Sequence, residues 1–386
     1  MSLVKLSDIA NVTAGQGTPQ GSCFSKEGAP FVRAGSLESL IAGKPERELE
    51  LVGEAVASKH RLKLQPPGTI VFAKNGMSCM KGYVYVLEHP CYVVSHLACI
   101  FPKNGNSKYL SYYFKCRKPN RLIKDVAYPY ISLADISNIL IELHSNKEQV
   151  KIVAILDKAS ELITLRKQQL EKLDLLVKSR FVEMFGNLDE NSKGFPLVSL
   201  KDCCIINPPR HRDNRLVDGL EVSFVPMAAV SEKGAVELTE TRRYEQVKTG
   251  FTYFSENDVL FAKITPCMEN GKGAIMEKLI NGVGFGSTEF HVLRPIVGIS
   301  NPYWLYQITV FDKFRKGAAM NMTGSAGQKR VPAAYLEKYN IGLPPLPIQN
   351  RFADFVRQVD KSKFEIKQSL EKLEKLKKSL MQQYFG

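Results

Sequence analysis

Apolar residues recur every three or four positions along two long stretches of this 386-residue chain, near 147–185 and 347–385. The positions at this spacing are Ile152, Leu156, Ala159, Ile163, Arg166, Leu170, Leu173, Val177, Arg180 and Met184 in the first stretch, and Phe352, Val356, Val359, Lys363, Ile366, Leu370, Leu373, Lys377, Leu380 and Tyr384 in the second. The pattern predicts two helices that form a coiled coil. Each helix would contain about 39 residues and extend about 58 Å.

The two stretches are also copies of each other. Residues 167–186 and 367–386 are identical at 11 of 20 aligned positions. Composition alone would give about one or two identities, so an internal duplication is the simplest explanation.

The ends of both predicted helices carry typical signals. Ser145 and Glu148 fit a capping box before the first helix, and three closely spaced prolines precede the second. Gly186 and Gly386 fit left-handed caps at the two C-terminal ends. The helices should therefore begin and end close to these residues.

The charged interruptions of the two seams do not coincide. The aligned pairs are Arg166 with Ile366, Lys363 with Ile163, Lys377 with Val177, and Arg180 with Leu380. Two identical helices would stack like charges, whereas these two avoid it, so we expect them to pair within one chain. The chain order of the globular stretches favours antiparallel packing, because the stretch between the helices then starts and finishes at adjoining helix ends.

The globular stretches contain short apolar runs separated by glycine and proline turns. "TIVFAK" (69–74) matches "DVLFAK" (258–263), and "YISLADISNILIEL" (130–143) aligns with "KRVPAAYLEKYNIGL" (329–343). We therefore predict an α+β protein with mixed β-sheets, in which the antiparallel coiled coil gives a pseudo-two-fold dumbbell. The expected parts are globular domains at 1–144 and 187–345 and long helices at 145–186 and 346–386.

The charge of the chain indicates a polyanionic partner. The sequence has 53 Lys and Arg against 39 Asp and Glu, a net charge of +14. Residues 1–146 carry +6, and 147–186, 187–346 and 347–386 carry +2, +2 and +4. Because no single tail holds the charge, the folded surfaces must, and nucleic acid is the expected partner.

Sequence features also bear on location and metals. "MSLVKLSDIANVTAG" lacks the apolar core of a signal peptide, and no apolar run is long enough to span a membrane, so we expect a cytoplasmic protein without membrane contact. The eight cysteines include no C-x-x-C pair. We interpret them as buried hydrophobic residues and expect no metal in this chain.

Several segments resemble the specificity subunit of type I restriction-modification enzymes. They are the helices ending in "VEMFG" and "MQQYFG", the segment "IGLPPLPIQ", and the run "TGSAGQKRVPAAYL" (323–336), which is similar to the Gly-Ser-x-Gln loop of that family. The resemblance covers the whole chain. The first globular domain departs from it, because it has "VAYPYISLADI" (126–136) where the loop is expected.

The resemblance implies two target recognition domains that read an asymmetric bipartite target in double-stranded DNA. It implies assembly with modification subunits, which use S-adenosylmethionine, and with restriction subunits, which use ATP and Mg, while this chain binds no cofactor. The length of the helices would set the unread spacer between the half-sites.

Polar and basic residues at turns are the candidate DNA contacts. "NPPRHRDNR" (207–215) places Arg210, His211, Arg212 and Arg215 after a double-proline turn, where they either read guanine and phosphate or form a solvated surface turn. Lys74 and Lys263 follow the matched "FA" runs, and they either contact phosphate or are solvated at strand ends. The other candidates are Gln16, Thr18, Arg33, Asn75, Lys81, Lys272, Ser325, Gln328, Lys329 and Arg330. We expect His96 to be a packed core histidine.

The sequence offers no convincing catalytic motif. "NPPR" (207–210) resembles the Asn-Pro-Pro-aromatic tetrad of amino-methyltransferases, but Arg210 replaces the aromatic residue and no glycine-rich cofactor loop precedes it. The chain also lacks G-x-x-x-x-G-K-S/T and H-E-x-x-H motifs. We therefore expect a non-catalytic subunit of a methyltransferase and endonuclease complex.

Apolar residues outside the helical seam predict a docking surface. Leu162, Leu165, Leu175, Leu176 and Phe181 exceed what a two-helix coil can bury. They either pack on the globular domains of this chain or bind helices of modification subunits. A structural coiled-coil adaptor that joins two protein-binding domains, without DNA recognition, is the alternative function.

Overall fold

The computed structural model describes residues 2–19, 24–103, 106–187, 190–325 and 327–386, without the side chain of Arg212. The chain divides into two compact units. Unit 1 comprises Met1–Gln168 and Lys367–Gly386, and unit 2 comprises Gln169–Ile366. The division passes through both long helices, because the ends of each helix belong to the hydrophobic cores of different units.

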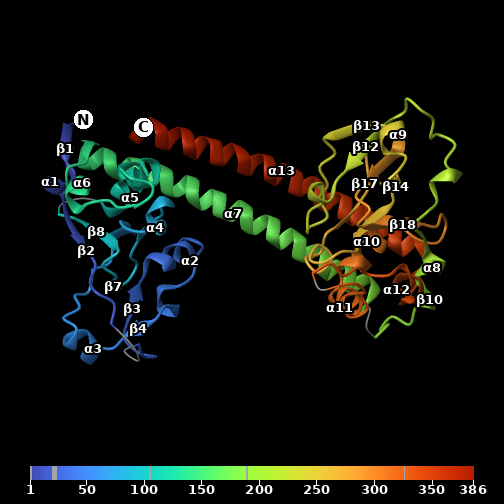
Figure 1. Ribbon diagram of the computed structural model, residues 1–386, viewed down its shortest axis with the longest axis horizontal. Helices are drawn as coiled ribbons and strands as arrows, with labels where there is room; N and C mark the ends of the chain where they lie inside the picture. Colours follow the sequence, from blue (N-terminus) through green and yellow to red (C-terminus); the bar gives the residue numbers. More distant parts are fainter. Residues whose placement is uncertain (1, 20–23, 104–105, 188–189, 326) are drawn as a thin grey trace. The chain divides into compact units, whose positions relative to one another are not determined.

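Unit 1 contains short strands and helices before the first long helix (Figure 1). They are β1 (Ser2–Lys5), α1 (Leu6–Ile9), β2 (Ala10–Ala14), β3 (Ala29–Val32), α2 (Leu37–Ile41), β4 (Leu51–Val52), α3 (Glu54–Lys59), β5 (Ile70–Ala73), α4 (Met77–Met80), β6 (Val84–Val86), β7 (Tyr92–Val93), β8 (Leu97–Pro102), α5 (Ser107–Cys116), α6 (Leu133–Ser137) and β9 (Leu140–Leu143).

The main sheet of unit 1 is antiparallel, with the strand order β2-β8-β5-β6. In its central pair, Ile70 lies opposite Ile100 and Ala73 lies opposite Leu97. All four residues of β5 are buried, so both faces of the strand are covered, as its continuous apolar run predicts. A smaller sheet pairs β3 with β7 in parallel, and β1 pairs with β9.

Unit 2 repeats this arrangement. Its elements are β10 (Leu197–Ser199), α8 (Leu200–Cys203), β11 (Cys204–Ile206), β12 (Glu221–Val225), β13 (Glu240–Arg243), α9 (Tyr244–Val247), β14 (Thr252–Ser255), β15 (Val259–Ala262), β16 (Gly273–Ile275), β17 (Val283–Gly286), β18 (Phe290–Pro295), α10 (Pro302–Val310), α11 (Asp312–Met320), α12 (Ala333–Lys338) and β19 (Asn340–Gly342). The main sheet has the order β11-β18-β15-β16, β12 pairs with β17 in parallel, and β10 pairs with β19. The duplication predicted for the globular parts is therefore confirmed in the topology.

The two long helices are α7 (Asn146–Phe185) and α13 (Leu346–Phe385). They begin and end within one residue of the bounds that the sequence predicts. The capping box at the start of α7 is also confirmed, because Ser145 N donates to Glu148 Oε2 at 3.0 Å and Glu148 N donates to Ser145 Oγ at 3.4 Å.

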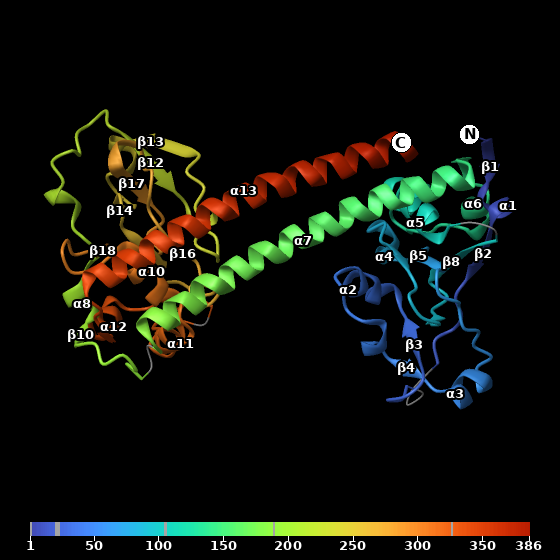
Figure 2. The same cartoon turned by 180° about the vertical axis from the view of Figure 1, so that it is seen from behind.

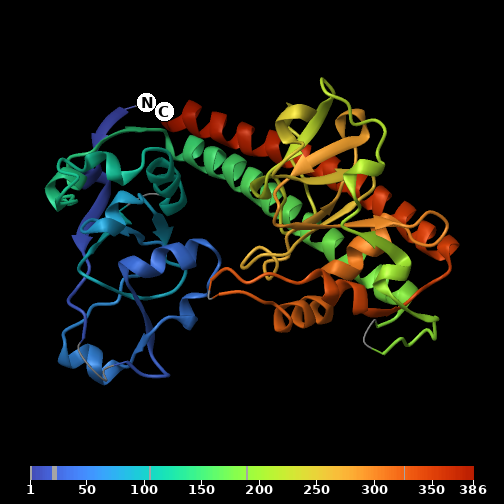
Figure 3. The same ribbon diagram turned by 45° about the vertical axis from the view of Figure 1, so that its right-hand side comes forward.

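In unit 1, the C-terminal half of α13 lies antiparallel to the N-terminal half of α7 (Figures 1 and 2). Lys167 Nζ is 3.2 Å from Glu374 Oε1 across the two helices. Closer to the globular part, Phe385 shares a core cluster with Leu156 and Tyr109. The last turns of α13 and the first turns of α7 accordingly lie at the same end of the pair (Figure 3).

In unit 2, the other halves of the helices pair in the same antiparallel sense. Lys363 Nζ is 2.8 Å from Asp174 Oδ1, so a basic interruption of one seam meets an acidic residue of the other helix. The ring of Phe352 lies 5.4 Å from the ring of Phe185. The predicted antiparallel pairing within one chain is confirmed.

The middle of the helix pair is less buried than its ends. Residues 160–176 of α7 and 360–384 of α13, all of which the structure describes, include no fully buried side chain. Two helices alone leave each seam residue open on one side, so the pair buries its apolar residues completely only where a globular part covers it.

Phe181 corrects the prediction of a docking residue. It is completely buried in unit 2, where its ring lies 4.7 Å from Phe185, 5.0 Å from Phe311 and 5.3 Å from Phe352. The prediction was wrong because this residue, although outside the seam, faces the globular part of its own unit. Among the residues that the structure describes, no helix is both long and apolar enough to cross a membrane.

Candidate nucleic-acid interface

In both units a lysine stands at the end of the central strand of the main sheet. In unit 2, the backbone N–H of Lys263 donates to Glu289 O at 2.9 Å, and Val331 N donates to Lys263 O at 2.9 Å. The next residue, Ile264, forms an antiparallel bridge with Arg330. These main-chain bonds hold the loop that precedes α12 against the end of β15.

Unit 1 has the same main-chain frame. Lys74 N donates to His96 O at 2.9 Å, Ile131 N donates to Lys74 O at 2.7 Å, and Asn75 forms an antiparallel bridge with Tyr130. We call this frame the lysine corner, formed by residues 74–75, 96 and 130–131 in unit 1 and by residues 263–264, 289 and 330–331 in unit 2. The structure thus joins the lysine of each unit to the loop that the sequence singled out.

Side chains in the corner of unit 2 are polar and charged. Arg330 donates from Nε and Nη2 to the two carboxylate oxygens of Glu289 at 2.9 and 2.7 Å. This hydrogen-bonded ion pair lowers the pKa of Glu289. Burial lowers the pKa of Lys263, an effect that Glu289 opposes. Ser325, Gln328 and Lys329 are exposed on the same loop, so their side chains are the ones that can reach a ligand.

Side chains in the corner of unit 1 differ. Lys74 is buried, its Nζ lies 3.3 Å from Asn75 Oδ1, and the ammonium lies 5.4 Å from the centre of the Tyr130 ring. His96 is exposed, so the prediction of a packed core histidine was wrong. Its backbone carbonyl belongs to the frame while its side chain remains at the surface. Glu289 and Tyr130 hold corresponding places near the lysines, and the sequence analysis did not select either.

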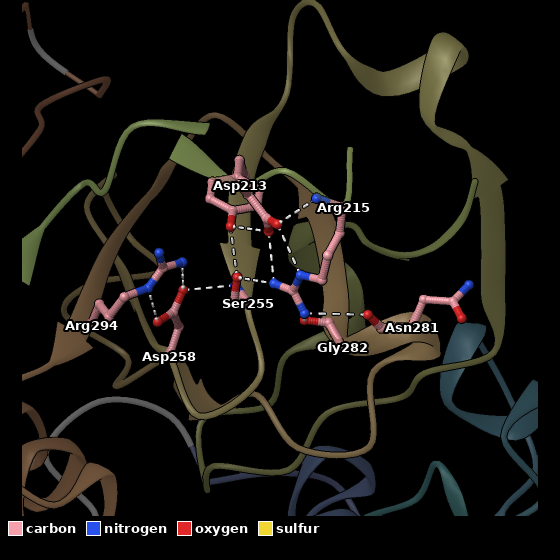
Figure 4. A network of polar contacts seen from close by, with 8 residues as sticks. Asp213, Arg215, Ser255, Asp258, Asn281, Gly282 and Arg294 are labelled. Carbon is pink, nitrogen blue, oxygen red and sulfur yellow. Dashed lines mark hydrogen bonds and ion pairs between the residues drawn. The ribbon is translucent and has the colours of Figure 1, made fainter. Parts of the chain in front are cut away.

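The turn at 207–215 divides its basic residues into two groups. Arg210 and His211 are exposed in a single 3-10 turn (Arg210–Arg212), and the side chain of Arg212 lies outside the described residues. Arg215 is held by Asp213, with its Nε 2.8 Å from Oδ1 and its Nη2 2.7 Å from Oδ2. Its Nη1 also donates to Gly282 O at 3.3 Å (Figure 4). Arg215 therefore secures the turn, and its guanidinium is already occupied.

Asp213 belongs to a larger polar network under the turn (Figure 4). Tyr253 donates to Asp213 Oδ2 at 2.6 Å and lies 2.7 Å from Ser255 Oγ. Arg294 pairs with the buried Asp258 through two bonds of 2.8 and 2.7 Å. The hydrogen bonds from Arg215 hold the pKa of Asp213 well below its usual range, and the network ties the turn to strand β14.

Asn207, the first residue of the "NPPR" run, has a structural role. It adopts a φ of 51°, and its Oδ1 accepts a hydrogen bond of 3.1 Å from Val292 N. Its Nδ2 lies 3.1 Å from His291 Nδ1, and His291 Nε2 lies 2.8 Å from Val331 O. The Asn207 amide is therefore engaged in supporting the lysine corner of unit 2.

The remaining candidate DNA contacts are engaged with local partners. Arg33 Nε is 2.7 Å from Glu50, Lys81 Nζ is 2.6 Å from Glu38, and Lys272 Nζ donates to Met227 O at 3.2 Å. Gln16 Nε2 donates to Arg61 O at 2.9 Å, and Thr18 is half-buried. These side chains contact other partners than the lysine corners, because each lies on a different loop.

The helices expose apolar side chains outside the seam. Leu165, Leu175 and Leu176 of α7 are exposed, whereas Leu162 is half-buried. On α13, Phe364 and Leu376 are also exposed, and the sequence analysis missed them. Their position outside the seam is the signal that would have found them. Among the described residues, no group of three His, Cys, Asp or Glu side chains is placed to hold a metal ion.

A family model for the type I restriction modification DNA specificity domain matches residues 1–175 and 193–378. The specificity subunits of the EcoAI and EcoEI type I restriction enzymes of Escherichia coli are 38% and 39% identical to this chain over 203 and 204 residues. Each of these matches covers 50% of this chain and only 33% of the relative. The MjaIX specificity subunit of Methanocaldococcus jannaschii is 24% identical over 98% of this chain and 90% of its own length.

Solved structures share the fold of the whole chain. A chain from a structural study of complex assembly and conformational transition of the type I R-M system aligns with a TM-score of 0.57 at 17% identity, covering 100% of this chain and 97% of that one. The type I restriction-modification S subunit from M. genitalium aligns with a TM-score of 0.57 at 12% identity, covering 100% and 96%.

Proposed function

The chain belongs to the type I restriction-modification DNA specificity family, and from this premise we propose that it is the DNA-reading subunit of such a system. The observation that carries the proposal is the duplicated lysine corner. One main-chain frame occurs twice and presents different side chains in the two units. A repeated frame with different side chains suits the reading of two different half-sites in one duplex.

The proposed target is double-stranded DNA, asymmetric and bipartite. In unit 2, Arg210, Gln328 and Lys329 are exposed donors that suit base edges and phosphates. Both long helices contribute residues to both units, so the helix pair is the element that would set the unread spacer between the half-sites.

The proposed role is non-catalytic. Methyl transfer from S-adenosylmethionine would belong to modification subunits, and ATP- and Mg-dependent translocation and cleavage to restriction subunits. The apolar side chains of Leu175, Leu176 and Phe364, exposed on the halves of the helices that belong to unit 2, support docking of helices from a modification subunit.

Selection from a random-sequence duplex library by the full-length chain tests the proposal. We expect enrichment of one bipartite sequence with two unlike halves. A chain that neutralises about 6–10 phosphates should lose roughly three to five decades of affinity for it between 50 and 200 mM salt. If no duplex is enriched and binding does not depend on salt, the coiled-coil adaptor replaces the DNA reader.

A further inference from the structure

Unit 1 exposes apolar side chains where unit 2 exposes polar ones. Beside the lysine corner of unit 1, Tyr128 is 82% exposed, Met77 is 73% exposed and Val126 is 67% exposed. Large apolar side chains at such exposure are costly to hydrate, and a group of them at one place indicates a binding surface. We name Met77, Val126 and Tyr128 the apolar tip.

The apolar tip stands on a fixed base. Pro129 is buried, and its carbonyl accepts a hydrogen bond of 3.0 Å from Gly76 N. That bond joins the residues directly next to Tyr128 and Met77 in the chain. On the far side of α4, Asn120 Nδ2 donates to Met80 O at 2.9 Å. The tip is therefore held in place from both of its segments before any ligand binds.

The corresponding loop of unit 2 has a different chemistry on the same frame. Its exposed side chains are Ser325, Gln328 and Lys329, which are hydrogen-bond donors and acceptors. Amide and ammonium groups read base edges by hydrogen bonds, whereas an apolar side chain reads the 5-methyl group of thymine in the major groove. The difference between the two loops is thus a difference in which base feature each can recognise.

The surroundings of the apolar tip favour nucleic acid over protein as its occupant. The segment 103–124, which leads into the tip, contains seven Lys and Arg residues and no Asp or Glu. The Lys74 ammonium also lies beneath the ring of Tyr130, 5.4 Å from its centre. A stable protein interface takes about 20–30 residues a side, far more than three tip residues. Apolar side chains bordered by cations fit a methyl group flanked by phosphates.

We propose that the apolar tip is the base-contacting element of unit 1 and that it recognises thymine through its 5-methyl group. The proposal rests on the proposed function, because it assumes that unit 1 reads one half of a DNA target. It adds that the two halves are read by different means: methyl contacts in the half bound by unit 1 and polar contacts in the half bound by unit 2.

The test uses the full-length chain and a duplex selected from a random library. Each thymine of that duplex is replaced in turn by deoxyuridine, which keeps the base pair and removes only the methyl group. We expect a loss of affinity of about fourfold for each contacted methyl, confined to one half of the target. Affinity that is unchanged at every replaced thymine would overturn the proposal.

Variants assign the effect to the tip. Tyr128→Ala and Met77→Ala should weaken binding to the thymine duplex and bind the deoxyuridine duplex as the unmodified chain does. Leu64→Ala removes another exposed apolar side chain of unit 1 and should keep the full deoxyuridine penalty, as should Gln328→Ala in unit 2. A full penalty in the Tyr128→Ala and Met77→Ala variants would overturn the proposal. Failure of the unmodified chain to enrich any duplex would instead contradict the proposed function.

Discussion

Arg210 and Arg215 lie five positions apart in one basic turn, yet their environments differ. Arg215 is held by Asp213 and by backbone carbonyls of a segment more than 60 residues away, whereas Arg210 is exposed. The sequence shows that both are arginines near a proline turn. It does not show which guanidinium is already paired, because that depends on contacts with distant strands.

Replacing each arginine with alanine should separate the two roles. Arg210→Ala should weaken DNA binding by about 1–3 kcal/mol without changing the free energy of unfolding. Arg215→Ala should lower the free energy of unfolding of unit 2 by about 1 kcal/mol, because Asp213 loses its partner. Urea unfolding followed by Trp304 fluorescence and duplex titration measure the two effects. Equal effects of both variants on unfolding would contradict the assignment.

His291 gives unit 2 a pH dependence. Burial lowers its pKa from the ordinary value of 6.5, so the unfolded chain binds this proton more readily than the folded chain does. The contribution of His291 is therefore fully present above pH 6.5 and is lost as the pH falls through its folded pKa. Trp304, the single tryptophan, is buried in unit 2, so its fluorescence in urea at pH 7.5 and 5.5 measures the change. We expect lower stability at pH 5.5, with a smaller difference in the His291→Gln variant, and equal values at both pH values would contradict it.

At the scale of elements, the sequence predicts long helices better than the environments of single side chains. The heptad pattern and the caps located α7 and α13 within one residue. The matched "FA" runs identified the strands β5 and β15, because a continuous apolar run is typical of a central strand. Phe181 was misplaced, because a helical pattern gives the face of a residue and not which globular part covers that face.

Phe181 and Leu175 provide a matched pair on α7. Phe181→Ala should lower the free energy of unfolding by about 3–5 kcal/mol, because it leaves a cavity among three aromatic rings. Leu175→Ala should change it by less than about 0.5 kcal/mol, because the side chain is exposed. Under the proposed function, Leu175→Ala combined with Leu176→Ala should weaken association with the modification subunit, measured by titration calorimetry. Unimpaired association would exclude this surface as the docking site.

At the scale of the whole molecule, the duplication was evident in the sequence, and the frame that it builds was not. The alignment of residues 130–143 with 329–343 matches corresponding loops. The bonds from Lys74 and Lys263 to His96 and Glu289 join segments more than 20 residues apart, and no short motif marks the latter two residues. Pairing across a sheet had to be known before the corner could be recognised.

The helix pair should control the target that the molecule recognises. Inserting seven residues into the middle of α7 and seven into the facing part of α13 keeps the heptad register and lengthens both helices by about 10 Å. Under the proposed function, the selected half-sites should stay the same while the spacer grows by about three base pairs. Sequencing of selected duplexes measures this change, and an unaltered spacer would show that the helices do not determine it.

The lysine corner is fastened by main-chain hydrogen bonds, and such bonds are indifferent to which side chains hang from them. Exchanges at Tyr128, Gln328 or Lys329 therefore leave the scaffold intact while altering what it meets. A lineage carrying this protein can drift to a new preference by single substitutions, and never has to pass through a form that cannot fold.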